Sequence, residues 1–147
     1  MSFAVVTLKK GEGRMLKSGG AWIFDNEIAS ILGAYENGDI VLVRDFDGYP
    51  MGRGFINEHS KIRIRMMTRN IDTEIDETFL TMRVKNAWEY RKKVMDDITS
   101  CRVIFGEADA FPGLTVDKFH DLLSVQVLSV GMERIQDILL PALAELL

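Results

Sequence analysis

Short apolar runs separated by turn signals make up the first seventy residues of the chain. The runs that are rich in β-formers lie at 3–8, 21–24, 27–32, 40–43, 51–56 and 60–67. Asn37-Gly38-Asp39 and Asp47-Gly48-Tyr49-Pro50 are the strongest turn signals between them. Residues 14–20 have room for one helical turn that ends at Gly19-Gly20. Strands at this spacing predict a small β-barrel or sandwich.

The pattern changes at about residue 70, where apolar residues begin to recur in steps of three and four. Asp76 is a good N-cap, and Glu77 suits the first turn of a helix. An amphipathic helix is therefore predicted. Its apolar stripe comprises Leu80, Val84, Ala87, Tyr90, Val94 and Ile98.

A hairpin is predicted from about Arg102 to Val130, with the segment GEADAFPGLTVDK between two apolar runs. Pro112 presets the first corner of a turn and Gly113 supplies a positive φ at the second, as in a type II turn. A last helix is expected from about Met132, and Pro141 is expected to kink or split it. The stripe of that helix is Ile135, Leu139, Leu143 and Leu146.

These elements predict an α+β fold: a small β-barrel-like domain at 1–70, followed by a helix and hairpin at 71–147. A chain of 147 residues allows one domain or two small ones. The net charge of −4 is uneven, with +2 over residues 1–70 and −6 over residues 71–147. This difference in surface chemistry favours two domains.

The cysteine count and the N-terminus bear on the compartment. Cys101 is the single cysteine, so no disulfide can form within the chain, which suits a reducing cytosol. The start, MSFAVVTLKKGEG, lacks the features of a signal peptide. No apolar run approaches the roughly 20 residues of a membrane span. We expect a cytoplasmic protein without membrane contact.

Two groups of basic residues are candidates for RNA contact. Lys61, Arg63 and Arg65 alternate with apolar residues, which places them on one strand face roughly 7 Å apart, a spacing comparable with that of phosphates. A solvated sheet face is the alternative. The second group lies beside Gly11, Gly13, Gly19 and Gly20, whose amides could bind anions. It comprises Lys9, Lys10, Arg14 and Lys17.

Trp22 and Phe24 could offer a stacking surface for an unpaired base, although a core position is the favoured interpretation for Trp22. The acids Glu107, Asp109 and Asp117 could be metal ligands or general bases. We favour a structural role, in which they bind turn amides, and predict no metal site. Cys101 is taken as an ordinary residue. No glycine-rich nucleotide motif is present, so neither a cofactor site nor a catalytic residue is predicted.

Four blocks of the chain resemble, in the same order, those of one protein family. GEADAFPGLTVDKF at 106–119 is similar to the family pattern GE(S/A)DGLPGLxVDxY, and QVL follows at 126–128. LKKGEGRMLKSGGAWIFDNEI at 8–28 resembles the family's basic N-terminal segment. NGDIVLVRDFDGYPMGRGFINEHSKIRIRMMT at 37–68 resembles the block that closes its barrel, and RVKNA at 83–87 with Arg91 resembles its R-x-x-x-A-x-x-x-R helix. The family comprises PUA-domain-containing, S-adenosylmethionine-dependent methyltransferases of cytosine C5 in large-subunit ribosomal RNA.

The resemblance implies that the chain is the PUA domain and part of the central domain of such an enzyme. In the family a catalytic domain follows, with the cofactor and a cysteine nucleophile, and Cys101 does not lie in its motif. S-adenosylmethionine is thus implied for the parent protein and ribosomal RNA as partner, with the chain read as truncated. A stand-alone RNA-binding adaptor and a protein-interaction module are the alternatives. The target nucleotide and homodimer formation stay open.

Overall fold

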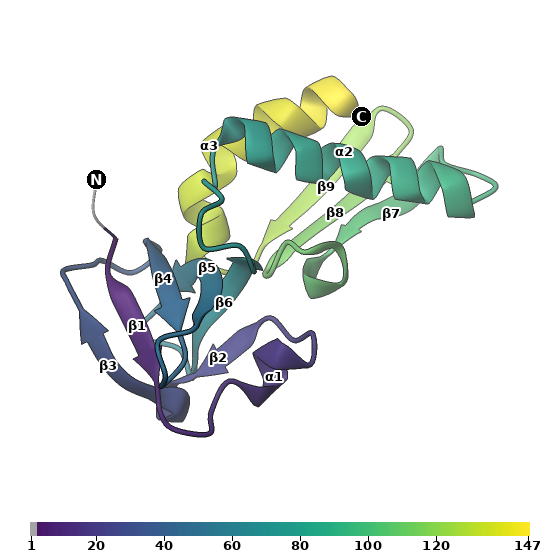
Figure 1. The fold of residues 1–147 in the computed structure, drawn as a ribbon. Coiled ribbons are helices and arrows are strands. Elements are labelled where there is room, and N and C mark those ends of the chain that lie inside the picture. The colour runs from purple at the N-terminus through teal and green to yellow at the C-terminus, as the bar shows by residue number, and fades with distance from the viewer. Residues whose placement is uncertain (1–2) are drawn as a thin grey trace. The chain divides into compact units, whose positions relative to one another are not determined.

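The computed structural model describes residues 3–147, which form two compact units (Figure 1). The first unit ends at Thr73 and the second comprises Glu74–Leu147. Within the described residues, no helix is both long enough and apolar enough to cross a membrane.

The first unit is a curled, six-stranded sheet that forms a half-barrel, as expected from its short apolar runs. The strand order is β2-β6-β5-β4-β1-β3, and every pair is antiparallel except β1 with β4. A one-turn helix, α1 (Arg14–Lys17), precedes β2, and a 3₁₀ turn, η1 (Asp25–Glu27), follows it. The strands are β1 (Val5–Leu8), β2 (Trp22–Phe24), β3 (Ile28–Leu32), β4 (Ile40–Arg44), β5 (Pro50–Ile56) and β6 (Ile62–Thr68).

Alternate residues of these strands fill the concave side of the sheet. Ile64 and Met66 of β6 are buried, as the alternation predicts, whereas Ile62 at the strand's start is only half-buried. Helix α1 contributes Leu16 to the same core. The buried cluster comprises Ala4, Val6, Leu8, Leu16, Ile23, Val41, Val43, Met51, Ile56, Ile64 and Met66.

Helix α2 (Glu77–Val94) opens the second unit. The Asp76 side chain accepts a hydrogen bond of 2.9 Å from the N–H of Phe79, which confirms the predicted N-cap. Leu80, Val84 and Ala87 are buried as expected, but Tyr90 and Val94 are 53% and 55% exposed. Ile98 lies beyond the helix. The prediction that the buried stripe continues through Tyr90, Val94 and Ile98 is therefore wrong. Periodicity identifies the apolar face of a helix but does not tell how much of that face the fold covers.

A three-stranded antiparallel sheet follows, where the sequence predicted a single hairpin. Its strands are β7 (Ser100–Phe105), β8 (Leu114–Phe119) and β9 (Leu122–Val127), in the order β7-β8-β9 (Figure 1). The prediction missed β8, because its polar residues were assigned to a loop. A 3₁₀ turn, η2 (Gly106–Asp109), follows β7.

The turn before β8 has the predicted geometry. The N–H of Leu114 donates to the carbonyl of Phe111 over 3.0 Å, and Gly113 has a φ of 87°. With Pro112 at the first corner, this is a type II turn.

Helix α3 (Val130–Leu146) closes the unit, and Ser129 caps it by accepting from the N–H of Met132. Pro141 does not split the helix, because α3 continues through it to Leu146. Pro141 itself is exposed, while Leu139, Ala142 and Leu143 on either side of it are buried. Packing of these neighbours offsets the backbone hydrogen bond that proline cannot make.

Candidate nucleic-acid interface

The connection between β1 and β2 carries four exposed cations: Lys9, Lys10, Arg14 and Lys17. Lys17 extends from α1 to Asp45, with 3.6 Å between Nζ and Oδ2. Among residues 3–147, the other three side chains form no hydrogen bond or ion pair. Lys9, Lys10 and Arg14 are therefore exposed to solvent without a partner among the described residues.

Three of the four glycine amides in this connection donate to acceptors within the first unit and are not open to an anion. The N–H of Gly13 donates to Glu27 Oε2 over 3.3 Å, and Gly13 is buried. The amides of Gly19 and Gly20 donate to the carbonyls of Leu16 and Met15 in α1. The Glu27 carboxylate, which also accepts from the N–H of Phe24, thus takes the place of a bound anion. No local sequence pattern predicts this contact, because Glu27 lies fourteen residues from Gly13.

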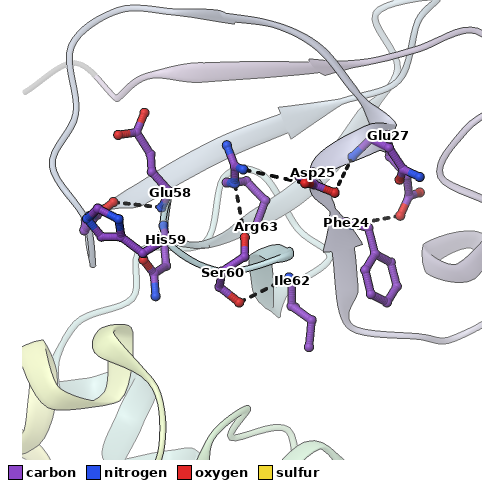
Figure 2. Close-up of polar contacts among 11 residues, drawn as sticks. Phe24, Asp25, Glu27, Glu58, His59, Ser60, Ile62 and Arg63 are labelled. Carbon is purple, nitrogen blue, oxygen red and sulfur yellow. Dashed lines mark hydrogen bonds and ion pairs between the residues drawn. The ribbon is translucent and has the colours of Figure 1, made fainter.

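Beside η1, the Arg63 side chain contacts Asp25 and Ser60 (Figure 2). Its Nη2 lies 3.9 Å from Asp25 Oδ2, and its Nε donates to the carbonyl of Ser60 over 3.3 Å. The side chain is 25% exposed. The pairing of β2 with β6 shifts register here, since Ile23 faces Ile64 but Phe24 faces Ile62. Arg63 is therefore the residue of β6 without a partner on β2 at this bulge, and its contacts with Asp25 and Ser60 hold the side chain within the first unit.

Carboxylates reduce the positive potential around Arg63, although Lys61 beside it is exposed. Besides Asp25, Glu58 lies nearby and accepts a hydrogen bond from the Tyr35 hydroxyl. That hydrogen bond raises the pKa of Tyr35, while the charge of Arg63 acts in the opposite direction. Phosphate contact is therefore less favoured here than beside α1.

Arg65 and Trp22 form the aromatic part of the candidate surface. They are register partners on β6 and β2, and the guanidinium carbon lies 5.5 Å from the ring centroid. Trp22 also meets Phe24 edge to face, with centroids 6.3 Å apart. Because Ile23 between them is fully buried, both rings lie on the convex side of the sheet. Trp22 is half-buried and outside the core cluster, so the core position favoured from the sequence is wrong.

The β2–β6 pairing thus divides the predicted RNA-contact residues between the two ends of β6. Arg65 lies near the α1 end, where a guanidinium nitrogen of Arg69 also lies within 3.8 Å of the Cβ position of Gly19. Lys61 and Arg63 lie beside η1, where the N–H of Lys9 also donates to the carbonyl of Glu27. We give the name α1 surface to the four cations of the β1–β2 connection together with Trp22 and Arg65, namely Lys9, Lys10, Arg14, Lys17, Trp22 and Arg65.

In the second unit the acids have specific partners. Asp109 accepts from Arg91 Nη2 over 2.6 Å and from the N–H of Phe105 over 2.7 Å. Asp117 was expected to accept a hydrogen bond from a turn amide. It pairs instead with Arg102 on the adjacent strand. The described residues contain no group of three or more His, Cys, Asp or Glu arranged to hold a metal ion.

The described residues do not fit S-adenosylmethionine in the usual Rossmann-like manner. That mode requires parallel strands joined by helices, with a glycine-rich turn at the end of the first strand. The second unit's sheet is antiparallel throughout. The first unit's only parallel pair, β1 with β4, is connected through β2 and β3.

We therefore expect no measurable binding of S-adenosylmethionine to this 147-residue chain. Isothermal titration calorimetry should give only heats of dilution, and labelled methyl transfer to ribosomal RNA should stay at background. Micromolar binding would show that these two sheets hold the cofactor in another way.

Comparison with protein families and solved structures agrees with this architecture. Residues 6–69 match a family model described as a PUA-like domain. A candidate SAM-dependent methyltransferase from Streptococcus mutans has the same fold, with a TM-score of 0.80 and 14% identity over 97% of this chain and 37% of that one. A second structure, described as a candidate methyltransferase complexed with SAH, has a TM-score of 0.78 and 15% identity over 99% of this chain and 37% of that one.

Curated relatives match nearly the whole chain. Ribosomal RNA large subunit methyltransferase I of Alteromonas mediterranea is 35% identical over 146 residues, which are 98% of this chain and 37% of that protein. The protein of the same name from Shewanella frigidimarina is 35% identical over 90% of this chain and 34% of its own length. Residues 6–69 therefore match the PUA-like domain family, and the chain as a whole is similar to ribosomal RNA large subunit methyltransferase I over about a third of that protein's length.

Proposed function

We propose that this chain is the RNA-recognising part of an S-adenosylmethionine-dependent ribosomal RNA methyltransferase. Its similarity to ribosomal RNA large subunit methyltransferase I, at 35% identity over 98% of the chain, is the observation that carries the proposal. The PUA-like match over residues 6–69 supports a binding role for the first unit.

The α1 surface is the proposed site of RNA contact. Its exposed lysines and Arg14 would neutralise phosphates, which supplies most of the affinity for RNA in a sequence-independent way. Trp22 and Arg65 would add a face on which an unpaired base can stack. Lys61 and Arg63 would contribute less, because Asp25 competes for Arg63.

The finer chemistry is also a proposal. The reaction would be methyl transfer to cytosine C5, as the sequence resemblance implies, and it would take place in the cytoplasm. S-adenosylmethionine would supply the methyl group in the parent enzyme. Since the two sheets described here do not fit that cofactor, the described residues would bind and orient RNA, and the reacting groups would lie outside them.

Titration of the chain with ribosomal RNA at several salt concentrations tests this proposal. The variant Lys10→Gln/Arg14→Gln should bind more weakly and lower the slope of log K against log salt by about 1.4, if each side chain meets one phosphate of a single-stranded target. Lys85→Gln/Lys93→Gln is the matched control, because it removes two exposed charges from α2 in the second unit.

Equal effects of the two double variants would show that only net charge matters and would contradict an RNA site on the α1 surface. A wild-type chain without any salt-dependent RNA binding would overturn the RNA-binding function itself. It would favour the protein-interaction module instead. Binding with the expected slope in a protein that never takes part in methylation would favour the adaptor.

A further inference from the structure

One acidic residue, Glu27, links the basic connection between β1 and β2 to the 3₁₀ turn η1. Its Oε2 accepts a hydrogen bond from the N–H of Gly13 over 3.3 Å. Its Oε1 accepts from the N–H of Phe24 over 2.9 Å (Figure 2). Its main-chain carbonyl accepts from the N–H of Lys9 over 2.8 Å. Glu27 therefore contacts both ends of the turn that begins at Lys9 and ends at Gly13.

This turn carries the cations of the α1 surface that have no ion pair. Lys9 and Lys10 lie within it, and Arg14 follows it as the first residue of α1. All three side chains are exposed, and none has a partner among residues 3–147. No contact of their own holds these cations in place, so the backbone of the turn decides where they lie. Glu27 holds that backbone at both ends.

The charge of Glu27 and the geometry of its contacts act in opposite directions on RNA. A carboxylate close to a group of cations lowers the positive potential that attracts phosphate. Its hydrogen bonds to backbone N–H groups are charge-assisted, however, and such bonds are roughly twice as strong as neutral ones. Because Gly13 is buried, its N–H would be left unsatisfied if the carboxylate were lost. Removal of Glu27 therefore gives opposite results for the two effects.

We propose that Glu27 is a positioning residue for RNA, which it does not itself contact. By accepting from the N–H groups of Gly13 and Phe24, it keeps the turn in the arrangement in which the exposed cations meet phosphates. When a binding-competent arrangement is populated less of the time, the affinity falls in proportion. This inference rests on the proposed RNA-binding function of the α1 surface. It adds a residue whose charge alone would oppose RNA.

Glu27→Gln and Glu12→Gln form a matched pair, because each removes one negative charge from the first unit close to the same cations. Glu12 lies within the turn and is exposed, and its side chain has no partner among the described residues. The amide introduced by Glu27→Gln keeps one acceptor oxygen but places an NH₂ group where the second acceptor was. Only Glu27→Gln therefore removes a hydrogen bond that holds the turn.

Titration of both variants with ribosomal RNA at several salt concentrations tests the proposal. Glu27→Gln should raise the dissociation constant about tenfold, as expected if the competent arrangement falls to about a tenth of the population. Glu12→Gln should lower it by up to about twofold, because only a screened repulsion is removed. The slope of log K against log salt should match the wild type in both, since no phosphate contact is lost. Equal or tighter binding by Glu27→Gln than by the wild type would overturn the proposal.

Amide hydrogen exchange without RNA measures the contact itself. In the wild type the N–H of Gly13 should exchange more slowly than that of Gly11, which donates to no acceptor within the described part of the chain. Glu27→Gln should speed exchange at Gly13 or Phe24 and leave the buried amides of β4 and β5 protected. Equal exchange at Gly13 and Gly11 in the wild type would overturn the proposal without any variant.

The two experiments also separate this inference from the function on which it rests. A wild-type chain that binds RNA, with an affinity that Glu27→Gln does not weaken, would overturn the inference alone. A wild-type chain that does not bind RNA would overturn the proposed function and the inference with it, whatever the exchange rate at Gly13.

Discussion

Gly113→Ala is expected to lower the free energy of unfolding of the second unit by about 2–3 kcal/mol. Gly113 has a φ of 87°, where a β-carbon costs roughly 1–2 kcal/mol. The added Cβ would also lie 2.4 Å from Ser129 Oγ. That hydroxyl caps α3 and donates to the carbonyl of Pro112, so displacing it should cost about 1 kcal/mol more. Hydrogen exchange of buried amides in β8 and α3 would measure the change.

Gly48→Ala is the matched control, since Gly48 has a φ of 88° but no heavy atom within 4 Å of the added Cβ. It should cost the first unit only the backbone contribution, about 1–2 kcal/mol. If both substitutions cost the same, the contact with Ser129 contributes nothing. The turn would then be independent of the α3 cap.

Asp109→Ala is expected to destabilise the second unit by a similar amount, about 3 kcal/mol. Only 9% of the Asp109 side chain and 16% of the Arg91 side chain are exposed. Removal of the carboxylate leaves the Arg91 guanidinium without its charged partner and the N–H of Phe105 without its acceptor. The two lost hydrogen bonds connect Asp109 in η2 to Arg91 in α2 and to Phe105 in β7. Hydrogen exchange in α2 and β7 would report the loss.

Asp117→Ala provides the comparison in the same sheet. Its ion pair with Arg102 is 2.8 Å long, but the two side chains are 24% and 50% exposed. Exposed pairs contribute between zero and about 1 kcal/mol, and salt screens them. We also expect magnesium to leave the melting temperature of the wild type and of both variants unchanged. A magnesium-dependent rise that is lost with Asp109 and Asp117 would instead identify them as metal ligands.

These comparisons test whether the residues of the Gly106–Lys118 segment stabilise the fold or bind a ligand. The run from Gly106 to Lys118 is the most distinctive part of the chain, yet its acids and glycine serve the fold. Asp109 anchors η2 to α2, and Gly113 lets the turn lie against the cap of α3. The proposed RNA contacts lie in the first unit, where the sequence is less distinctive and the charge is positive.

The amino-acid sequence by itself determined the local structure. Short apolar runs between turn signals located the six strands of the first unit, Asp76 located the start of α2, and Pro112-Gly113 located a type II turn. These features depend on side-chain period, capping and backbone φ, which act over a few residues. The order of the four blocks also indicated the PUA-like domain that the family match covers.

Only the tertiary structure decided what the polar and exposed residues contact. Glu27 accepts from the Gly13 amide, which looked open to an anion, Arg63 pairs with Asp25, and Trp22 lies beside Arg65. The place of β8 between β7 and β9 likewise depends on which strands pair. Partners of this kind come from distant parts of the chain, and a period or a turn signal carries no information about them.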